Sequence, residues 1–412
     1  MVYLDHASTS YPKAPGVAAA MGDALGVPGS AGRGTGAGSG RGEAIDDALR
    51  SALAATIGAD EPSRVVLTPG ATASLNMAIN GVALAARGRR ARARRRPLLV
   101  TTQIEHNAVR RPLLALAQRG DIDLRIVAAD SRGRVEAGAI VEAARGAELV
   151  AMAWASNATG AILPVQDVGA ALAGTNTLLL VDGSQTVGVL GAERSLRDLG
   201  IDLLAFSGHK ALHGPAGVGV LYVGPRAHPL RARKGAAVRI DPWLVGGTGV
   251  ESVDAAMPAD LPTRFEPGTR ATVLHAGLLS AIEGRDRASD PLGHARRLRA
   301  LMVDGLAGLG PRVRVHGETD SARCVGVVPF TIDGFSPDEA AIVLGSEFGI
   351  VVRAGLHCAP GAHEAMGTLS GGGTLRASVG EATTEADVRA LVEAVGAMAG
   401  VANSPGHDSV KS

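Results

Sequence analysis

The chain has 412 residues, of which 46% are hydrophobic and only 2% aromatic, and its formal net charge is +1. A chain of this length can bury a large core and form two domains. The near-neutral charge argues against a nucleic-acid-binding surface, and two cysteines exclude a disulfide framework.

Cysteine usage and the first residues bear on where the protein works. A chain with so few cysteines is typical of a reducing cytoplasm. The opening residues MVYLDHASTS have neither the basic leader nor the apolar core of a signal peptide, and no apolar run reaches membrane-spanning length. We therefore expect a cytoplasmic protein with neither a nucleic acid nor a membrane as partner.

Two segments have a biased composition. Residues 26–42 contain eight glycines, but the G-x-G-x-x-G spacing of a dinucleotide-binding loop does not occur there and no strand precedes it. We interpret it as a loop near a site. Residues 87–96 read RGRRARARRR, which predicts a solvated connection between a helix and a strand, with a phosphate or RNA contact as the alternative.

Seven short apolar runs alternate with longer Ala- and Leu-rich segments. The runs are RVVLT (64–68), PLLVTT (97–102), DLRIVA (123–128), ELVAMAWAS (148–156), TLLLVDG (177–183), DLLAFSG (202–208) and VGVLYV (218–223). Strands that alternate with helices predict an α/β domain with a mainly parallel sheet covered on both faces. We expect this large domain to span residues 25–265.

The pattern of apolar and helical segments changes beyond residue 275. Longer helical segments there flank the strand-like runs VGVVPFTID (325–333) and GIVVRAG (349–355). This predicts a smaller C-terminal α+β domain over residues 266–402, followed by a disordered tail at 403–412. Residues 1–24 are expected to form an N-terminal segment that packs near the small domain and the active site.

Polar residues follow the first two strands, where ligands bind in parallel sheets. Ala71 and Thr72 begin a helix directly after the first strand, and backbone amides there suit a phosphate, although helix capping is the alternative. His106 follows the second strand. Its ring suits a base or a surface that stacks on a cofactor, and capping is again the alternative.

Further polar residues follow the later strands. Asn157 follows the run at 148–156, and Asp182 and Gln185 follow the next run. A carboxylate placed directly after four apolar residues is costly unless a buried cation pairs with it. Ser207 and His209 follow the apolar residues LLAF of the sixth run.

Lys210 follows them, and it is unusual because only four of the 41 basic side chains are lysines. Arginine keeps its proton near neutral pH, whereas a buried lysine can lose it and become a nucleophile. A phosphate cradle, a ring that can stack, a buried carboxylate and a lysine that can form a Schiff base together describe a pyridoxal phosphate pocket.

The chain resembles the class V aminotransferase-fold enzymes, and among them the cysteine desulfurases and selenocysteine lyases. The motifs that carry this resemblance cover nearly the whole chain: YLDHASTSYPKAP (3–15), GATASLNMAIN (70–80), EHN (105–107), NATG (157–160), VDGSQT (181–186), SGHKALHGPAGVGVLY (207–222), GGTG (246–249), FEPGT (265–269), VRAGLHCAPGAH (352–363) and LRASVG (375–380). The resemblance implies a pyridoxal-phosphate-dependent transferase of fold type I, with a seven-stranded large domain, and a homodimer.

The same resemblance implies roles around pyridoxal 5'-phosphate. Lys210 would hold the cofactor as a Schiff base, Asp182 would bind the pyridine nitrogen and Gln185 the ring oxygen. His106 would stack on the ring. Further residues would surround the cofactor and its phosphate: Ala71, Thr72, Asn157, Ser207, His209 and, from the neighbouring subunit, Thr269. No metal is expected.

Other residues would meet the substrate. Arg376 would pair with the substrate carboxylate through a bidentate fork, and Asn157 and Ala7 would contact the substrate. Cys358 is a candidate nucleophile, with Lys210 and His106 as the other catalytic residues. Arg353 and His357 stand close to Cys358 in the sequence and can favour a thiolate, whereas Cys324 is interpreted as an inert small hydrophobe.

The resemblance implies that sulfur passes from L-cysteine to Cys358 as a persulfide, that alanine is released, and that an acceptor protein or small molecule then takes the sulfur. Two alternatives stay open. One is another class V reaction on a specialised amino acid, such as selenocysteine cleavage, C–S elimination, transamination or epimerisation. The other is a non-catalytic binding protein that uses the arginine run and the glycine-rich loop.

The sequence departs from the family pattern in two places: the glycine-rich segment lacks the histidine often seen near RGG in relatives, and the motif that begins at Gly268 differs. Residues 268–271 read Gly-Thr-Arg-Ala where relatives carry Gly-Thr-Pro-Asn. Arg270 therefore puts a bulky charge near the expected subunit boundary.

Overall fold

The computed structural model describes residues 1–27, 39–90, 95–190, 195–229, 238–250, 253–286 and 289–400. Most of the glycine-rich segment, residues 91–94 of the arginine run and the C-terminal tail lie outside the described residues, so the predictions for them stay predictions. Within the described ranges, no helix is both long enough and apolar enough to cross a membrane.

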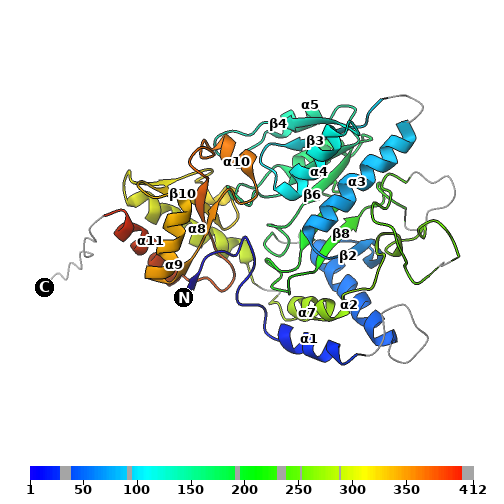
Figure 1. Ribbon diagram of the computed structural model, residues 1–412, viewed down its shortest axis with the longest axis horizontal. Helices are drawn as coiled ribbons and strands as arrows, with labels where there is room; N and C mark the ends of the chain where they lie inside the picture. Colours follow the sequence, from blue (N-terminus) through cyan, green and yellow to red (C-terminus); the bar gives the residue numbers. More distant parts are fainter. Residues whose placement is uncertain are drawn as a thin grey trace.

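A seven-stranded sheet forms the centre of the larger lobe (Figure 1). Its strands, in chain order, are β2 (Val65–Thr68), β3 (Leu98–Thr102), β4 (Asp123–Val127), β5 (Leu149–Ala153), β6 (Leu178–Asp182), β7 (Leu203–Ser207) and β8 (Gly219–Val223). The spatial order is β2-β8-β7-β6-β5-β3-β4, and only β8 runs antiparallel to its neighbours. The predicted mainly parallel α/β sheet is thus confirmed, each strand lying within its apolar run.

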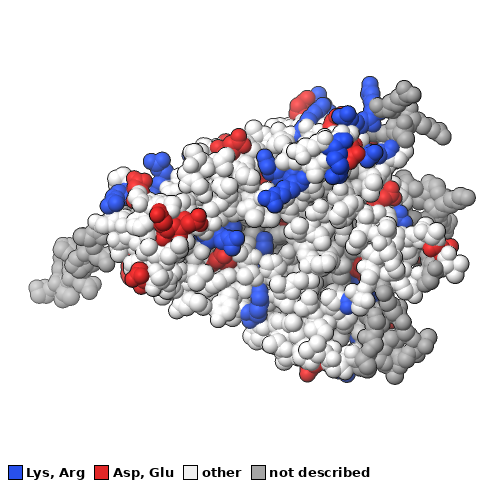
Figure 2. Space-filling view, viewed as in Figure 1, with Lys and Arg blue, Asp and Glu red and all other residues white. Residues whose placement is uncertain are grey.

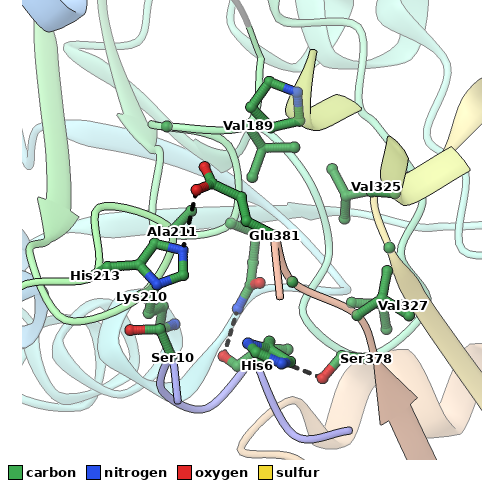
Figure 3. Close-up of a pocket in the computed structure, with 18 of the residues that line it drawn as sticks. His6, Ser10, Val189, Lys210, Ala211, His213, Val325, Val327, Ser378 and Glu381 are labelled. Atoms are coloured by element: carbon green, nitrogen blue, oxygen red, sulfur yellow. Dashed lines mark hydrogen bonds and ion pairs between the residues drawn. The ribbon is translucent and has the colours of Figure 1, made fainter. Parts of the chain in front are cut away.

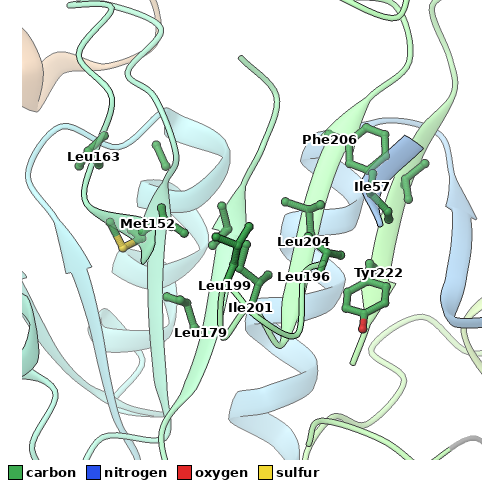
Figure 4. Packing of buried hydrophobic residues seen from close by; sticks show 14 of the residues in the cluster. Ile57, Met152, Leu163, Leu179, Leu196, Leu199, Ile201, Leu204, Phe206 and Tyr222 are labelled. Atoms are coloured by element: carbon green, nitrogen blue, oxygen red, sulfur yellow. The ribbon is translucent and has the colours of Figure 1, made fainter. Parts of the chain in front are cut away.

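Helices cover both faces of this sheet. One face carries α3 (Ala71–Arg90) and α4 (Asn107–Gln118); the other carries α2 (Ser39–Ile57), α5 (Ala137–Ala143) and α6 (Val165–Leu172). Successive strand residues feed the two cores in turn, since Leu203 packs with α3 while Leu204 packs with α2. Figure 4 shows part of the second core, where Leu204 and Phe206 meet Ile57.

The smaller lobe has an antiparallel sheet in the order β12-β13-β10-β9. Its strands are β9 (Val313–Val315), β10 (Val327–Ile332), β12 (Arg353–Gly355) and β13 (Thr374–Ser378), and its helices are α8 (Pro291–Gly308), α9 (Pro337–Phe348), α10 (Pro360–Ala365) and α11 (Glu385–Met398). Within the described residues, three short 3-10 helices lie at Pro62–Arg64, Thr263–Phe265 and Ser321–Arg323.

The predicted strand at 349–355 is split in two. Its first part, β11 (Ile350–Val351), pairs in parallel with the N-terminal strand β1 (Val2–Tyr3), and only the second part, β12, joins the small sheet. The N-terminus therefore lies on the smaller lobe (Figure 1). From there the chain crosses to α1 (Val17–Leu25).

Helix α7 (Thr272–Glu283) packs against α1 and α2, whereas α8 packs against α11 and the small sheet. The connection between the lobes along the chain thus runs between α7 and α8. The domain boundaries given above stay a prediction. On the face seen in Figure 2, acidic and basic side chains are interspersed over both lobes.

A buried cluster of charges ties α2 to the loop before α7. Arg50 binds Glu266 in a bidentate manner, with Nη1 donating to Oε1 at 2.7 Å and Nη2 donating to Oε2 at 2.6 Å. Both side chains are 4% exposed. Glu266 also accepts the backbone N–H of Leu67 on β2. Arg270, which replaces the usual proline, pairs with Glu266 and with the fully buried Asp46. The bulky charge is therefore neutralised within the chain.

Replacing Glu266 with alanine is expected to lower the free energy of unfolding by about 3–5 kcal/mol, because Arg50 would be left buried without its partner. Urea unfolding followed by circular dichroism measures this. The matched control is the double variant Arg50→Met with Glu266→Leu, which removes both charges and should lose less. A double variant as unstable as Glu266→Ala would contradict this account.

Candidate functional site

A cavity of about 280 Å³ opens at the carboxyl ends of the central strands. Its lining contains every residue that the sequence singled out for the site, with the exception of Thr269: Ala7, Ala71, Thr72, His106, Asn157, Asp182, Gln185, Ser207, His209, Lys210, Cys358 and Arg376. These residues come from both lobes and from the N-terminal segment. Among the residues that the structure describes, no group of three His, Cys, Asp or Glu side chains is arranged to hold a metal.

Lys210 lies in the turn that follows β7 and lines this cavity. The turn is tight at Gly208, where a Cβ atom would come within 2.7 Å of the Leu278 side chain. Burial lowers the pKa of the Lys210 amine; the charge of Asp182 opposes this effect and that of Arg376 adds to it. A lowered pKa makes the free amine, the form that acts as nucleophile or base, easier to reach.

Asp182 ends strand β6 and is 7% exposed. One oxygen accepts the backbone N–H of Ser184 at 2.9 Å. No cation within the described part of the chain forms an ion pair with this carboxylate. Because a buried carboxylate is costly without a positive partner, the site suits a ligand that brings one, such as a protonated pyridine nitrogen.

The start of helix α3 forms the other end of the cavity. Ser207 at the end of β7 accepts the backbone N–H of Ala71 at 3.1 Å, which places a hydroxyl at the helix N-terminus beside Thr72. Strand β8 passes so close that a Cβ atom on Gly219 would lie 2.4 Å from Gly70. A hydroxyl pair at the positive end of a twenty-residue helix fits a phosphate group.

His106 is both a helix cap and a cavity residue. Its Nδ1 accepts the backbone N–H of Ala108 at 3.0 Å and caps α4, so the neutral ring carries its proton on Nε2. Burial is the main cause that lowers the pKa of His106. The position of His106 is therefore compatible with both interpretations of the sequence, namely that it caps the helix and that its ring lies against a bound ligand.

Glu105, which the sequence analysis did not single out, is fully buried beside the site. Its Oε1 accepts bonds from the Thr102 hydroxyl at 2.6 Å and from the backbone N–H of Ala153 at 3.1 Å. Burial raises the pKa of this carboxyl to about 8, and the charge of Asp182 adds to the effect. Nothing in the letters TTQIEHN distinguishes a buried glutamate from a solvated one.

Stability should therefore fall as the pH rises through the range set by Glu105. Between its unfolded pKa of 4.5 and its folded pKa of about 8, the folded state holds a proton that the unfolded chain has released. One such proton gives a slope of at most about 1.4 kcal/mol per pH unit. Glu105→Gln removes this titrating carboxyl. Urea unfolding should therefore show that the free energy of unfolding of the variant rises relative to that of the unmodified protein from pH 5 to pH 8. Parallel pH profiles would contradict this.

Arg376 on β13 is 2% exposed and already has a carboxylate partner. Its Nη2 donates to Asp5 at 2.8 Å and to the Ser8 hydroxyl at 2.7 Å, and Nη1 donates to the backbone oxygen of Asn157. Asp5 and Ser8 were not among the site residues expected from the sequence. A substrate carboxylate at this guanidinium would have to share it with Asp5.

Three of the predicted residues also hold neighbouring segments in place. Gln185 donates to the backbone oxygen of Ala7 at 2.9 Å, and His209 bonds to the Thr9 hydroxyl at 3.0 Å, so both fix the N-terminal segment over the cavity. Asn157 donates to the backbone oxygen of His357 and fixes the loop that carries Cys358.

Cys358 is exposed and lines the cavity from a loop in which both His357 and Cys358 have positive φ angles, of 50° and 57°. The loop sits tightly on the large lobe, since a Cβ on Gly361 would lie 2.0 Å from the backbone oxygen of Gln103. Backbone strain of this kind clusters at functional sites.

The expectation that His357 favours a thiolate by its charge is wrong. Its ring is 7% exposed and bonds to Thr374, and burial lowers its pKa to about 2, so it is neutral. Lys210 and Arg376 interact electrostatically with Cys358. Arg353 lines the cavity as well.

Cys324 differs from Cys358 in each of these respects. It is fully buried, its sulfur contacts the backbone oxygen of Glu318 at 3.8 Å, and burial raises its pKa to about 11. These surroundings keep it a thiol, as expected of an inert core residue.

Thr269 is exposed and lies outside the cavity lining. The loop that carries it is fixed by the bond from the Gly268 N–H to the Gly247 oxygen at 2.9 Å. Its predicted place in the site of a neighbouring subunit stays a prediction.

Comparison with known proteins places this geometry in a family. The family model Aminotransferase class-V matches residues 2–391. The chain is 29% identical to a probable cysteine desulfurase of Methanothermobacter thermautotrophicus, covering 97% of this chain and 95% of that protein. It is 33% identical to probable cysteine desulfurase 2 of Mycobacterium leprae, over 84% and 79% of the two chains.

Solved structures agree. The apo structure of a cysteine desulfurase from Thermococcus onnurineus NA1 superposes with a TM-score of 0.84 at 26% identity, covering 97% of this chain and 94% of that one. The S-sulfonic acid form of cysteine desulfurase CsdA from Escherichia coli has a TM-score of 0.78 at 29% identity, covering 96% and 93%. The chain therefore belongs to the class-V aminotransferase family, whose members are pyridoxal-phosphate-dependent enzymes.

Proposed function

We propose that the protein is a cysteine desulfurase that removes the sulfur atom of L-cysteine and releases alanine. The observation that carries the proposal is the position of Cys358, an accessible thiol on the wall of the cavity that also contains Lys210 and Arg376. A class V enzyme that only moves amino groups or protons has no need of a thiol there. The names of the relatives support the same reaction.

The residues of the cavity fit pyridoxal phosphate. Lys210 would bind it covalently, the unpaired carboxylate of Asp182 would hold the pyridine nitrogen, and the N-terminus of α3 with Ser207 and Thr72 would hold the phosphate. His106 would lie against the ring, and Gln185 would bind the ring oxygen with the amide proton that Ala7 leaves free. When bound, this cofactor withdraws electrons from the bonds at Cα of an amino acid.

The chain's own residues would then do the following. Arg376 binds the substrate carboxylate, with Asp5 and Ser8 fixing the guanidinium from behind. Lys210, whose pKa burial lowers, takes the α-proton of the substrate and later returns a proton. His106 offers its Nε2–H to groups in the cavity.

Cys358 would carry out the sulfur transfer. Its thiolate attacks the sulfur of the bound cysteine, so that a new S–S bond forms while the substrate's Cβ–S bond breaks. The electron pair of the broken bond stays with the three-carbon fragment, which gains protons and leaves as alanine. The two sulfur atoms together lose two electrons and the substrate's Cβ atom gains them, so the transfer needs no external oxidant. Its exposure allows a protein or small-molecule acceptor to take the terminal sulfur.

We also propose that the enzyme is a homodimer. Five large apolar side chains are exposed on the loop beside the one that carries Thr269: Trp243, Leu244, Val245, Val250 and Val253. Exposed apolar groups gathered in this way mark an interaction surface. A second copy would cover them and bring Thr269 to the neighbouring cavity. Light scattering should give twice the chain mass, and a fully active monomer would refute this.

Product analysis with a panel of amino acids tests the reaction. The enzyme loaded with cofactor should convert L-cysteine to alanine, and in the presence of a reductant it should release an equal amount of sulfide. Pyruvate and ammonia would indicate elimination, a keto acid would indicate transamination, and an inverted centre would indicate epimerisation. Preference for selenocysteine over cysteine would indicate a lyase for selenium.

A further inference from the structure

A second cavity, of about 60 Å³, lies behind Lys210 (Figure 3). We call it the rear cavity, and we call the cavity of about 280 Å³ described above the front or substrate cavity. It shares only four lining residues with the substrate cavity, namely Ala7, Ser184, Gln185 and Lys210. The hydrogen bond from Gln185 to the backbone oxygen of Ala7 closes part of the partition between the two spaces. Lys210 therefore borders two cavities, and only the larger one is needed for cofactor and substrate.

The rear cavity has an apolar side and a polar side. Val189, Val325 and Val327 form the first, and His6 and His213 stand opposite them (Figure 3). Glu381 completes the polar side.

The Glu381 side chain is 38% exposed and marks the outer end of the cavity. Its carboxylate pairs with Arg285 at 2.7 Å and faces the Nε2 of His213 at 3.7 Å. The charge of Lys13 also acts on His6 and His213, and its amine is bound by Thr9, Ser10 and the backbone oxygen of His209.

The hydroxyl of Ser184 is a buried polar atom on this cavity that has no hydrogen-bond partner in the described residues. Buried polar groups are nearly always bonded to protein or to ordered water. A water molecule needs about 10–15 Å³ of such space, so the cavity has room for several. Burial lowers the pKa of His6 to about 4 and also lowers that of His213, so both rings are neutral and can accept as well as donate.

We propose that the rear cavity is a water-filled route through which the Lys210 amine exchanges protons with solvent while substrate occupies the front cavity. The inference rests on the proposed function, in which Lys210 takes and returns a proton. Cofactor and substrate fill the front side, so the amine can meet water only from behind. Water molecules between Glu381, His213 and Ser184 would pass protons to and from the amine, with no net change in charge.

Filling the cavity tests this proposal. Val189→Phe and Ala211→Leu fill it from two different segments, and Ile342→Phe, on the exposed surface of α9, is the matched control. The protein loaded with pyridoxal phosphate is incubated in ordinary water with L-alanine deuterated at Cα, and loss of the deuterium is followed by NMR. We expect both filled variants to lose deuterium up to about 1.5-fold more slowly than the unmodified protein and the control, because an amine that keeps the abstracted deuterium still carries two protons that it can return in its place. Absorbance titration should show L-alanine binding within about twofold of normal.

Deuterium loss at the unmodified rate in both filled variants would overturn the proposal, as would its absence in the unmodified protein. The reaction does not involve Cys358, so a failure of the sulfur chemistry leaves this test intact. Crystals of the unmodified protein should show ordered water between Lys210 and Glu381, and a dry cavity would also contradict the proposal.

Discussion

Replacing Lys210 with alanine is expected to abolish alanine release from L-cysteine, a loss of about a thousandfold or more, because the variant lacks both the covalent anchor and the base. The visible absorbance of the bound cofactor should change at the same time, and borohydride should no longer fix the cofactor to the chain. Absorbance spectra and amino-acid analysis of the products measure both effects.

Lys210→Arg is the control that separates charge from chemistry. Arginine keeps the positive charge beside Asp182 but cannot give up its proton near neutral pH. We therefore expect it to be as inactive as the alanine variant. Substantial turnover by either variant would show that another group binds the cofactor.

Replacing Cys358 with alanine is expected to stop sulfur transfer, with a loss of at least about a hundredfold, while the cofactor spectrum stays unchanged. The reason is positional, because Cys358 lines the cavity but makes no side-chain hydrogen bond with any described residue that holds the cofactor site together. Persulfide on the protein, alanine and bound cofactor are measured in the same sample.

Cys324→Ala is the matched control for the thiol. Cys324 is buried in the smaller lobe with its pKa raised, so its loss should cost stability but leave turnover within about twofold. Native rates of sulfur release from Cys358→Ala would show that the proposed nucleophile is wrong, and loss of activity in Cys324→Ala alone would point to the other cysteine.

The sequence allowed most of the site to be predicted because parallel strands end at one edge of the sheet. Asp182 ends β6 and Lys210 follows β7, so they lie near one another because these two strands are neighbours in the sheet, and the short apolar runs locate both strands. The fold class, the seven strands and the cavity residues at the strand ends rest on this local pattern, whereas Ala7 and Arg376 were expected in the site from the family resemblance.

Contacts between distant segments could not be predicted in this way. Asp5 and Arg376 are 371 residues apart, and they meet because the N-terminal strand β1 pairs with β11. A strand of two residues is too short to give a recognisable pattern in the sequence, so this pairing could not be predicted. Protonation states could not be predicted from the sequence either. His357 is neutral and Glu105 is protonated because of burial, which depends on packing by segments that the local letters do not identify.

If Cys358 receives the sulfur of L-cysteine, its mass must increase during the first turnover. The protein loaded with cofactor is mixed with L-cysteine without reductant. The mass of the peptide that contains Cys358 is measured by mass spectrometry, and the amount of alanine released is measured in the same sample. The account predicts one added sulfur atom on Cys358 for each alanine released in the first turnover. Alanine formed without added sulfur on Cys358, or pyruvate in place of alanine, would contradict it.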